Sequence, residues 1–177
     1  MITVFGSLNV DYIFQVPHLP TPGETVLASG MQVLPGGKGA NQAVAAARAG
    51  AKVCMVGAVG RDGLSEIALA GLLDVGVDTS AVAQSRKPTG TAAINVDAQG
   101  ENAITVSSGA NLDARGDSLN EKNLTPRTTL LLQMEAPMTA MADLIQRARK
   151  KEACIVWNLA PMQSVDLSLL TQVDCLI

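Results

Sequence analysis

The sequence predicts an α/β fold, a doubly wound parallel sheet accompanied by a small second β-sheet. Short apolar runs of the kind found in buried parallel strands alternate along the chain with helical segments. The strand-like runs are residues 2–8, 53–59, 129–134, 154–158 and 173–177, and the helical segments are residues 41–49, 64–73 and 138–151. This alternation indicates βαβ units within one α/β domain that spans residues 1–177.

One stretch departs from the alternation. Residues 90–97 and 102–107 are two strand-like stretches on either side of the turn at 98–101, which predicts a β-hairpin. Residues 12–16 and 25–32 are also strand-like. Together these four segments predict the small second sheet.

A glycine-rich loop at residues 34–42 reads LPGGKGANQ and leads into an alanine-rich helical segment. Its glycines allow close approach of backbone or ligand, and the helix N-terminus that follows favours a polar ligand. The loop is not a Walker loop, because Gly39 follows Lys38 where a serine or threonine is required. It is not a dinucleotide fingerprint either, because Gln42 stands where glycine or alanine is required.

The polar side chains of this loop are Lys38 and Asn41, which suit hydroxyls or an anionic oxygen. The alternative is a tight turn before a packed helix. Asn9 and Asp11 follow the first apolar run and, two residues apart in extended chain, point to the same side. A carboxylate beside an amide can hold neighbouring sugar hydroxyls; the alternative for this pair is an Asx turn.

Composition excludes several classes of function. The chain has 177 residues, 47% hydrophobic and 16% charged, as in a globular domain with a sizeable core. Its net charge of −3 argues against a nucleic-acid surface, and no apolar run is long enough to predict a membrane span or a signal peptide. The three cysteines have neither disulfide nor zinc spacing, so we expect no metal site and a cytoplasmic protein.

Several ordered motifs carry a family resemblance. They are GSLNVD at 6–11, PTPGET at 20–25, GGKGANQAVAAARAG at 36–50, SSGAN at 107–111, LLLQMEAP at 130–137 and WNLAP at 157–161. The chain resembles the amino-terminal half of the ribokinase-like, PfkB-type carbohydrate kinases over essentially its whole length. The resemblance implies part of a ribokinase-like doubly wound sheet. It also implies that segments around 12–32 and 90–107 form a lid, which closes over the sugar and pairs with a partner's lid in a homodimer.

The resemblance also implies which residues bind the substrate. The positions that match the sugar-binding residues of the family are Asn9, Asp11, Gly36, Gly37, Lys38, Asn41 and Glu135. For Glu135 the alternative is a solvated strand terminus. Asn158 matches in position as well, but Leu159 follows it where the family usually has proline. The small residues Ala92 and Ala93 fall in the expected lid.

The implied reaction is ATP-dependent phosphorylation of a sugar hydroxyl, with D-ribose to ribose 5-phosphate favoured. ATP and Mg²⁺ are the implied cofactors, with a monovalent cation as a candidate activator. The GAGD-type motif that supplies the family's catalytic base and the NxxE motif do not occur in the sequence. We therefore expect an amino-terminal fragment, inactive alone, with the base beyond Ile177 and cofactor-binding residues unassigned. The alternatives are a fructokinase-like kinase, or a non-catalytic module that binds sugar or dimerises.

Overall fold

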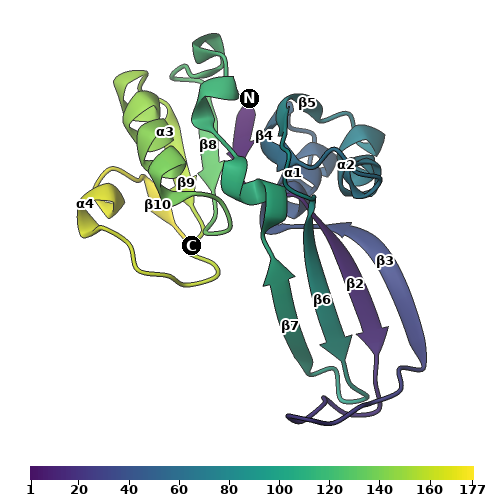
Figure 1. Cartoon of the computed structure of the whole chain (residues 1–177). Helices are drawn as coiled ribbons and strands as arrows, with labels where there is room; N and C mark the ends of the chain where they lie inside the picture. The colour runs from purple at the N-terminus through teal and green to yellow at the C-terminus, as the bar shows by residue number, and fades with distance from the viewer.

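The computed structural model describes all 177 residues and contains two β-sheets that lie side by side (Figure 1). The larger sheet has six strands, all parallel, in the order β10-β9-β8-β1-β4-β5. These strands are β1 (Ile2–Phe5), β4 (Val53–Val59), β5 (Asp78–Gln84), β8 (Thr129–Leu132), β9 (Cys154–Trp157) and β10 (Cys175–Leu176). The order places β1 in the interior, and the chain winds outward from it in both directions.

Helices cover both faces of this sheet, which makes it doubly wound. The helices are α1 (Lys38–Arg48), α2 (Leu64–Asp74), α3 (Met138–Lys150) and the short α4 (Leu167–Leu170). Val4 and Phe5 are neighbours on β1 and point to opposite faces of the sheet. Val4 packs in the apolar cluster that contains α1 and α2, whereas Phe5 packs in the one that contains α3. The predicted fold class is confirmed.

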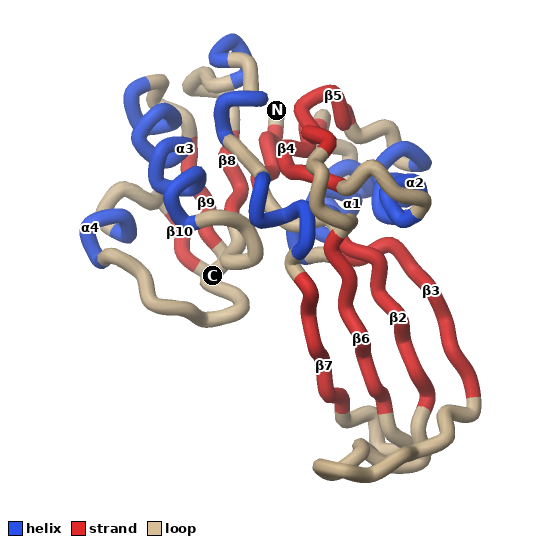
Figure 2. The backbone as a smooth tube through the Cα atoms, in the orientation of Figure 1, coloured by secondary structure: helices blue, strands red, loops and turns tan.

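The smaller sheet extends away from the larger one (Figure 2). Its strands are β2 (Asn9–Gln15), β3 (Gly30–Gly36), β6 (Gly90–Val96) and β7 (Asn102–Ser107), in the order β3-β2-β6-β7. β2 and β6 run parallel, and the two outer strands run antiparallel to them. Every residue of β7 is exposed. The predicted hairpin and second sheet are thus confirmed.

The register of the small sheet determines what its faces carry. One row of directly opposed residues contains Leu34, Asp11, Ala92 and Val106, and the next contains Gln32, Ile13, Ile94 and Ile104. Because directly opposed residues and residues two apart share a face, both rows lie on the same side of the sheet. That face is largely apolar around the carboxylate of Asp11.

One predicted strand was wrongly placed, and one strand was not predicted at all. The strand expected at 25–32 is β3, at Gly30–Gly36, so the first glycine of the glycine-rich loop, Gly36, itself belongs to the strand. The strand β5 was not expected, because its sequence DTSAVAQ is mostly small and polar, as suits the sheet edge it occupies. No helix of the chain combines the length and apolar character needed to cross a membrane.

Candidate functional site

The candidate site lies where β1 ends and the chain passes into the small sheet through the turn Gly6-Ser7-Leu8. The N-terminus of α1 packs directly on this turn: the Ala40 N–H donates to the Ser7 carbonyl over 3.0 Å. Gly37 has φ of +92°, and a Cβ there would lie 2.7 Å from the Ser7 carbonyl oxygen. Only glycine fits this position, so the loop is built to bring α1 against the end of β1.

Glu135 joins three parts of the site. It follows β8, the neighbour of β1, so Ser7 and Glu135 both lie just past the carboxyl ends of adjacent strands. The Glu135 carboxylate accepts hydrogen bonds from Ser7 Oγ (2.6 Å), from the Lys38 backbone N–H (3.1 Å) and from Lys38 Nζ (2.9 Å). It is therefore not a solvated strand terminus; it anchors the first residue of α1, where the helix dipole favours a carboxylate.

The two carboxylates of the site differ in pKa. Burial raises the pKa of Glu135, but the hydrogen bonds from Ser7 and Lys38 outweigh it and hold the pKa below its usual value. The pKa of Asp11 is raised, first by burial and then by the nearby negative charge of Glu135, with Lys38 acting in the opposite direction. Glu135 is thus ionised throughout the neutral range, while Asp11 binds a proton more readily than an ordinary aspartate.

A small cavity of about 100 Å³ gathers most of the predicted site residues. Asn9, Asp11, Gly37, Lys38, Asn41 and Glu135 line it, together with Ala92, Ile94, Ile104 and Val106 from the small sheet. Gly36 does not line the cavity, but a Cβ at Gly36 would collide with the Asp11 carboxylate. The cavity therefore places carboxylate, amide and ammonium groups under an apolar wall, which suits a small polyhydroxylated ligand.

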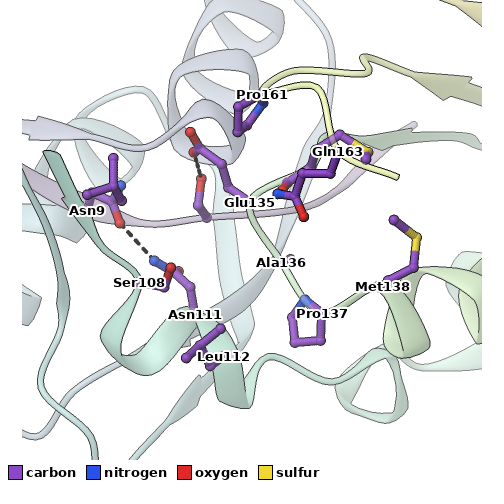
Figure 3. A pocket seen from close by; sticks show the side chains of 13 residues that line it. Asn9, Ser108, Asn111, Leu112, Glu135, Ala136, Pro137, Met138, Pro161 and Gln163 are labelled. Carbon is purple, nitrogen blue, oxygen red and sulfur yellow. Dashed lines mark hydrogen bonds between the residues drawn. The ribbon is translucent and has the colours of Figure 1, made fainter. Parts of the chain in front are cut away.

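A second cavity has a volume of about 370 Å³ (Figure 3). It shares Asn9, Val106 and Glu135 with the first cavity. Its polar wall includes Ser7 and Asn111. Its other wall comes from the segments after β8 and β9 and includes Ala136, Pro137, Met138, Pro161 and Gln163. The three shared residues therefore lie between the two cavities, near the carboxyl edge of the large sheet.

Two residues of the site were not among the predicted ones, namely Ser7 and Asn111. Ser7 bonds Glu135, and Asn111 bonds both Leu8 and Asn9. Both lie within motifs noted in the sequence, GSLNVD and SSGAN, but these contacts join positions more than 100 residues apart. Neither Asn158 nor Ala93 lines either cavity.

No group of three or more His, Cys, Asp or Glu side chains in the structure is arranged to hold a metal ion. The polar groups of the site are instead the donors and acceptors that bind hydroxyls, placed at the carboxyl edge of a doubly wound sheet. The fold and the site together define an α/β protein with a polar cavity whose lining suits a small polar ligand.

Comparison with known proteins identifies the family. The profile of the pfkB family carbohydrate kinases matches residues 1–177. The chain is 38% identical to the ribokinase of Haemophilus influenzae over 176 residues, which cover 98% of this chain and 58% of that protein. The chain belongs to the pfkB family of carbohydrate kinases.

Solved structures agree with this assignment. The ribokinase of Thermotoga maritima superposes with a TM-score of 0.88 at 34% identity. The ribokinase of Arabidopsis thaliana, solved in complex with ribose and ATP, superposes with a TM-score of 0.84 at 30% identity. Each comparison covers 99% of this chain and 58% of the other, so the chain spans less than two thirds of the length of these relatives.

Proposed function

We propose that this chain carries the sugar-binding part of an ATP-dependent sugar kinase, with D-ribose as the substrate and ribose 5-phosphate as the product. The observation that carries the proposal is the meeting of Asn9, Asp11, Lys38, Asn41 and Glu135 in one small cavity. These residues come from segments up to 126 positions apart, and they match the sugar-binding positions of the family. The relatives most similar to the chain include ribokinases, which favours ribose.

In the proposed reaction the chain binds and orients the sugar. The Asp11 carboxylate accepts hydrogen bonds from sugar hydroxyls, while Asn9, Asn41 and Lys38 supply donors. Glu135 keeps Lys38 and the start of α1 in place, so the whole set is preorganised. Holding the sugar in this way presents its primary hydroxyl in line with the γ-phosphate of ATP, the geometry that phosphoryl transfer requires.

The proposed chemistry forms a bond between the hydroxyl oxygen and the γ-phosphorus, breaks the bond from that phosphorus to the β,γ-bridging oxygen and releases ADP. When bound, Mg²⁺ would neutralise the phosphate charge, and a monovalent cation is a candidate activator. The side chains of this chain form no metal-ligand cluster, and we assign none of them to Mg²⁺, to ATP or to the base that takes the hydroxyl proton.

We also propose that the small sheet is a lid over the sugar and pairs with the same sheet of a second copy. The face of this sheet that carries Asp11 also carries exposed apolar side chains, with Ile104 54% and Val106 46% exposed. Covering these side chains with a partner would bury apolar surface and exclude water from the reaction. Ile104→Asp should give a monomer in sedimentation, whereas Thr105→Asp, on the opposite face of β7, should not. A wild-type chain that is monomeric at every concentration would contradict the pairing.

Calorimetric titration of the folded chain with D-ribose, D-fructose and adenosine tests the binding proposal. Saturable binding with ribose preferred supports it, and a preference for fructose would indicate the fructokinase-like alternative instead. A folded chain that binds none of them contradicts the assignment of the site. Adding ATP and Mg²⁺ to the ribose complex tests whether these residues also catalyse the transfer. We expect no ribose 5-phosphate above background from these 177 residues. Binding without turnover is also what the alternative of a non-catalytic sugar-binding module predicts, whereas turnover above background would contradict the expectation that these residues only bind the sugar.

A further inference from the structure

Asn111 lies on the 3₁₀ turn Gly109–Asp113, beside the start of the small sheet, and it is 1% exposed. All three of its side-chain hydrogen bonds are made within the protein. Its Oδ1 accepts from the Leu8 N–H over 2.9 Å, and its Nδ2 donates to the Leu8 carbonyl over 3.2 Å and to Asn9 Oδ1 over 2.7 Å. Both hydrogens of its amide are therefore used, so Asn111 is a fixed element of the site.

The backbone of Leu8 determines which way the Asn111 amide points. A backbone N–H can only donate, so the atom that faces it must be the oxygen of Asn111. A backbone carbonyl can only accept, so the atom that faces it must be the nitrogen. The second hydrogen on that nitrogen then points at Asn9, and the Asn9 atom that receives it must be an acceptor. This fixes the orientation of the Asn9 amide: its oxygen faces Asn111 and its nitrogen faces away. The assignment of oxygen and nitrogen rests on the donor and acceptor of the Leu8 backbone.

Once its oxygen is held by Asn111, Asn9 has only its NH₂ group left for a ligand. Asn9 is 3% exposed and lines both cavities, and no protein group accepts a hydrogen bond from its Nδ2 (Figure 3). Gly90 packs closely against both amides, because a Cβ there would collide with Asn9 Oδ1 and with Asn111 Nδ2. An amide NH₂ group that faces a cavity and has no protein acceptor is free to donate to a bound molecule.

We propose that Asn111 is a positioning residue that makes Asn9 a hydrogen-bond donor only, and that this sets the specificity of the site. The inference rests on the proposed function, because it concerns how the sugar is recognised. Asp11 lies two residues further along the same face of β2. When its carboxylate is ionised, it can only accept hydrogen bonds. The site therefore requires a hydroxyl that accepts from Asn9 together with one that donates to Asp11. A polyol with neighbouring hydroxyls meets both demands, whereas a ligand with a hydrogen at the position facing Asn9 leaves its NH₂ unpaired.

Two isosteric substitutions test whether Asn9 presents its NH₂ group to the cavity as a donor. Asn9→Asp replaces the NH₂ in the cavity with an oxygen, while the other oxygen still accepts from Asn111. Asn111→Asp keeps the bond from the Leu8 N–H but gives Asn9 a partner that only accepts, so the Asn9 amide turns and presents its oxygen to the cavity. Asn102→Asp, the same chemical change at an exposed position on β7, is the matched control.

The readout is the affinity for D-ribose and for its singly deoxygenated analogues, measured by calorimetry on this chain. In the wild type, removing the hydroxyl that faces Asn9 should weaken binding by about 10- to 100-fold. In Asn9→Asp and Asn111→Asp, ribose itself should bind about 10-fold or more weakly. The penalty for that one deoxygenation should fall to about 3-fold or less in both variants, while the penalties at other positions remain. A purely structural effect would weaken all the sugars equally and leave the pattern of penalties unchanged.

The outcomes separate this inference from the proposed function. If the wild type binds none of the sugars, the proposed function fails and the inference falls with it. If the wild type binds ribose and a folded Asn9→Asp binds it equally well, binding needs no donor from Asn9 and only the inference is overturned. An unchanged pattern of penalties in both variants also overturns it. Asn9→Asp leaves the bonds between Asn111 and Leu8 intact, so it decides the matter even if Asn111→Asp does not fold.

Discussion

Replacing Glu135 with glutamine should destabilise the fold by an amount that depends on pH. Ser7 Oγ and the Lys38 backbone N–H both donate to Glu135 Oε2, whereas Lys38 Nζ donates to Oε1. A glutamine whose oxygen takes the Oε2 position keeps the first two bonds and turns its NH₂ toward the ammonium group. Glu135→Gln therefore loses one charge-assisted bond and the ion pair.

The expected loss can be worked from the surroundings of the pair. The Glu135 side chain is 12% exposed, but the Lys38 side chain is 41% exposed and its ammonium can return to water. A hydrogen bond to a charged group contributes about 1.5–3 kcal/mol, and screening of the exposed partner reduces this to about 1–2 kcal/mol at neutral pH. With a urea m-value of about 2 kcal/mol/M, the unfolding midpoint should fall by about 0.5–1 M.

The pKa of Glu135 gives this prediction its pH dependence. Because its folded-state pKa is depressed, the carboxylate contributes stability above its unfolded pKa of about 4.3, and this contribution is lost as the pH falls through the folded pKa. The difference in stability between wild type and Glu135→Gln should therefore shrink in acid.

Urea unfolding measures this difference through the fluorescence of Trp157, the single and fully buried tryptophan. Glu121→Gln, in an exposed pair with Lys151 at 3.5 Å, is the control and should have the smaller effect. Equal stability of wild type and Glu135→Gln at neutral pH, or a difference that persists undiminished in acid, would refute the role given to Glu135.

Three further predictions concern the site and its support. Sugar affinity should fall as acid protonates Asp11, beginning at a higher pH than for an ordinary aspartate because its pKa is raised, and titration calorimetry over a pH series should find this acid limb absent from Asp11→Asn. Gly36→Ala should weaken sugar binding because its Cβ meets the Asp11 carboxylate, whereas Gly63→Ala, with open space around it, should bind as the wild type does. Thr89→Val should lower the free energy of unfolding by about 1–3 kcal/mol in urea titrations. The reason is that the buried hydroxyl of Thr89, the residue before β6, donates to Asp62 and accepts from the Gly60 backbone N–H. An unchanged unfolding midpoint would show that these bonds do not stabilise the fold.

Most strands of the large sheet were predictable because each is a short apolar run that can be recognised from its own residues. Residues 53–59 are apolar and bounded by Lys52 and Gly60, and the structure places β4 over the same residues, all of them buried. The helices α2 and α3 likewise begin where the sequence predicted. β5 was not predicted, because it lies at the edge of the sheet and its sequence has no continuous apolar run.

The candidate site was predictable only in part. Asn9, Asp11 and Lys38 lie in short motifs whose residue types suggest binding, so sequence could nominate them. The link from Ser7 to Glu135 spans 128 positions, and that from Asn9 to Asn111 spans 102. Such contacts depend on which strands become neighbours in the sheet, and neither periodicity nor composition encodes a particular long-range pair. The orientation of the Asn9 amide depends on a backbone group in a turn, which a residue pattern cannot express.

A structure of this chain with D-ribose bound would show whether the small cavity is the sugar site. We expect the sugar to occupy the small cavity, with one hydroxyl within hydrogen-bond distance of Asn9 Nδ2 and another within hydrogen-bond distance of the Asp11 carboxylate. Ribose bound at a place remote from Asp11, or a cavity that stays free of sugar at saturating ribose, would contradict it.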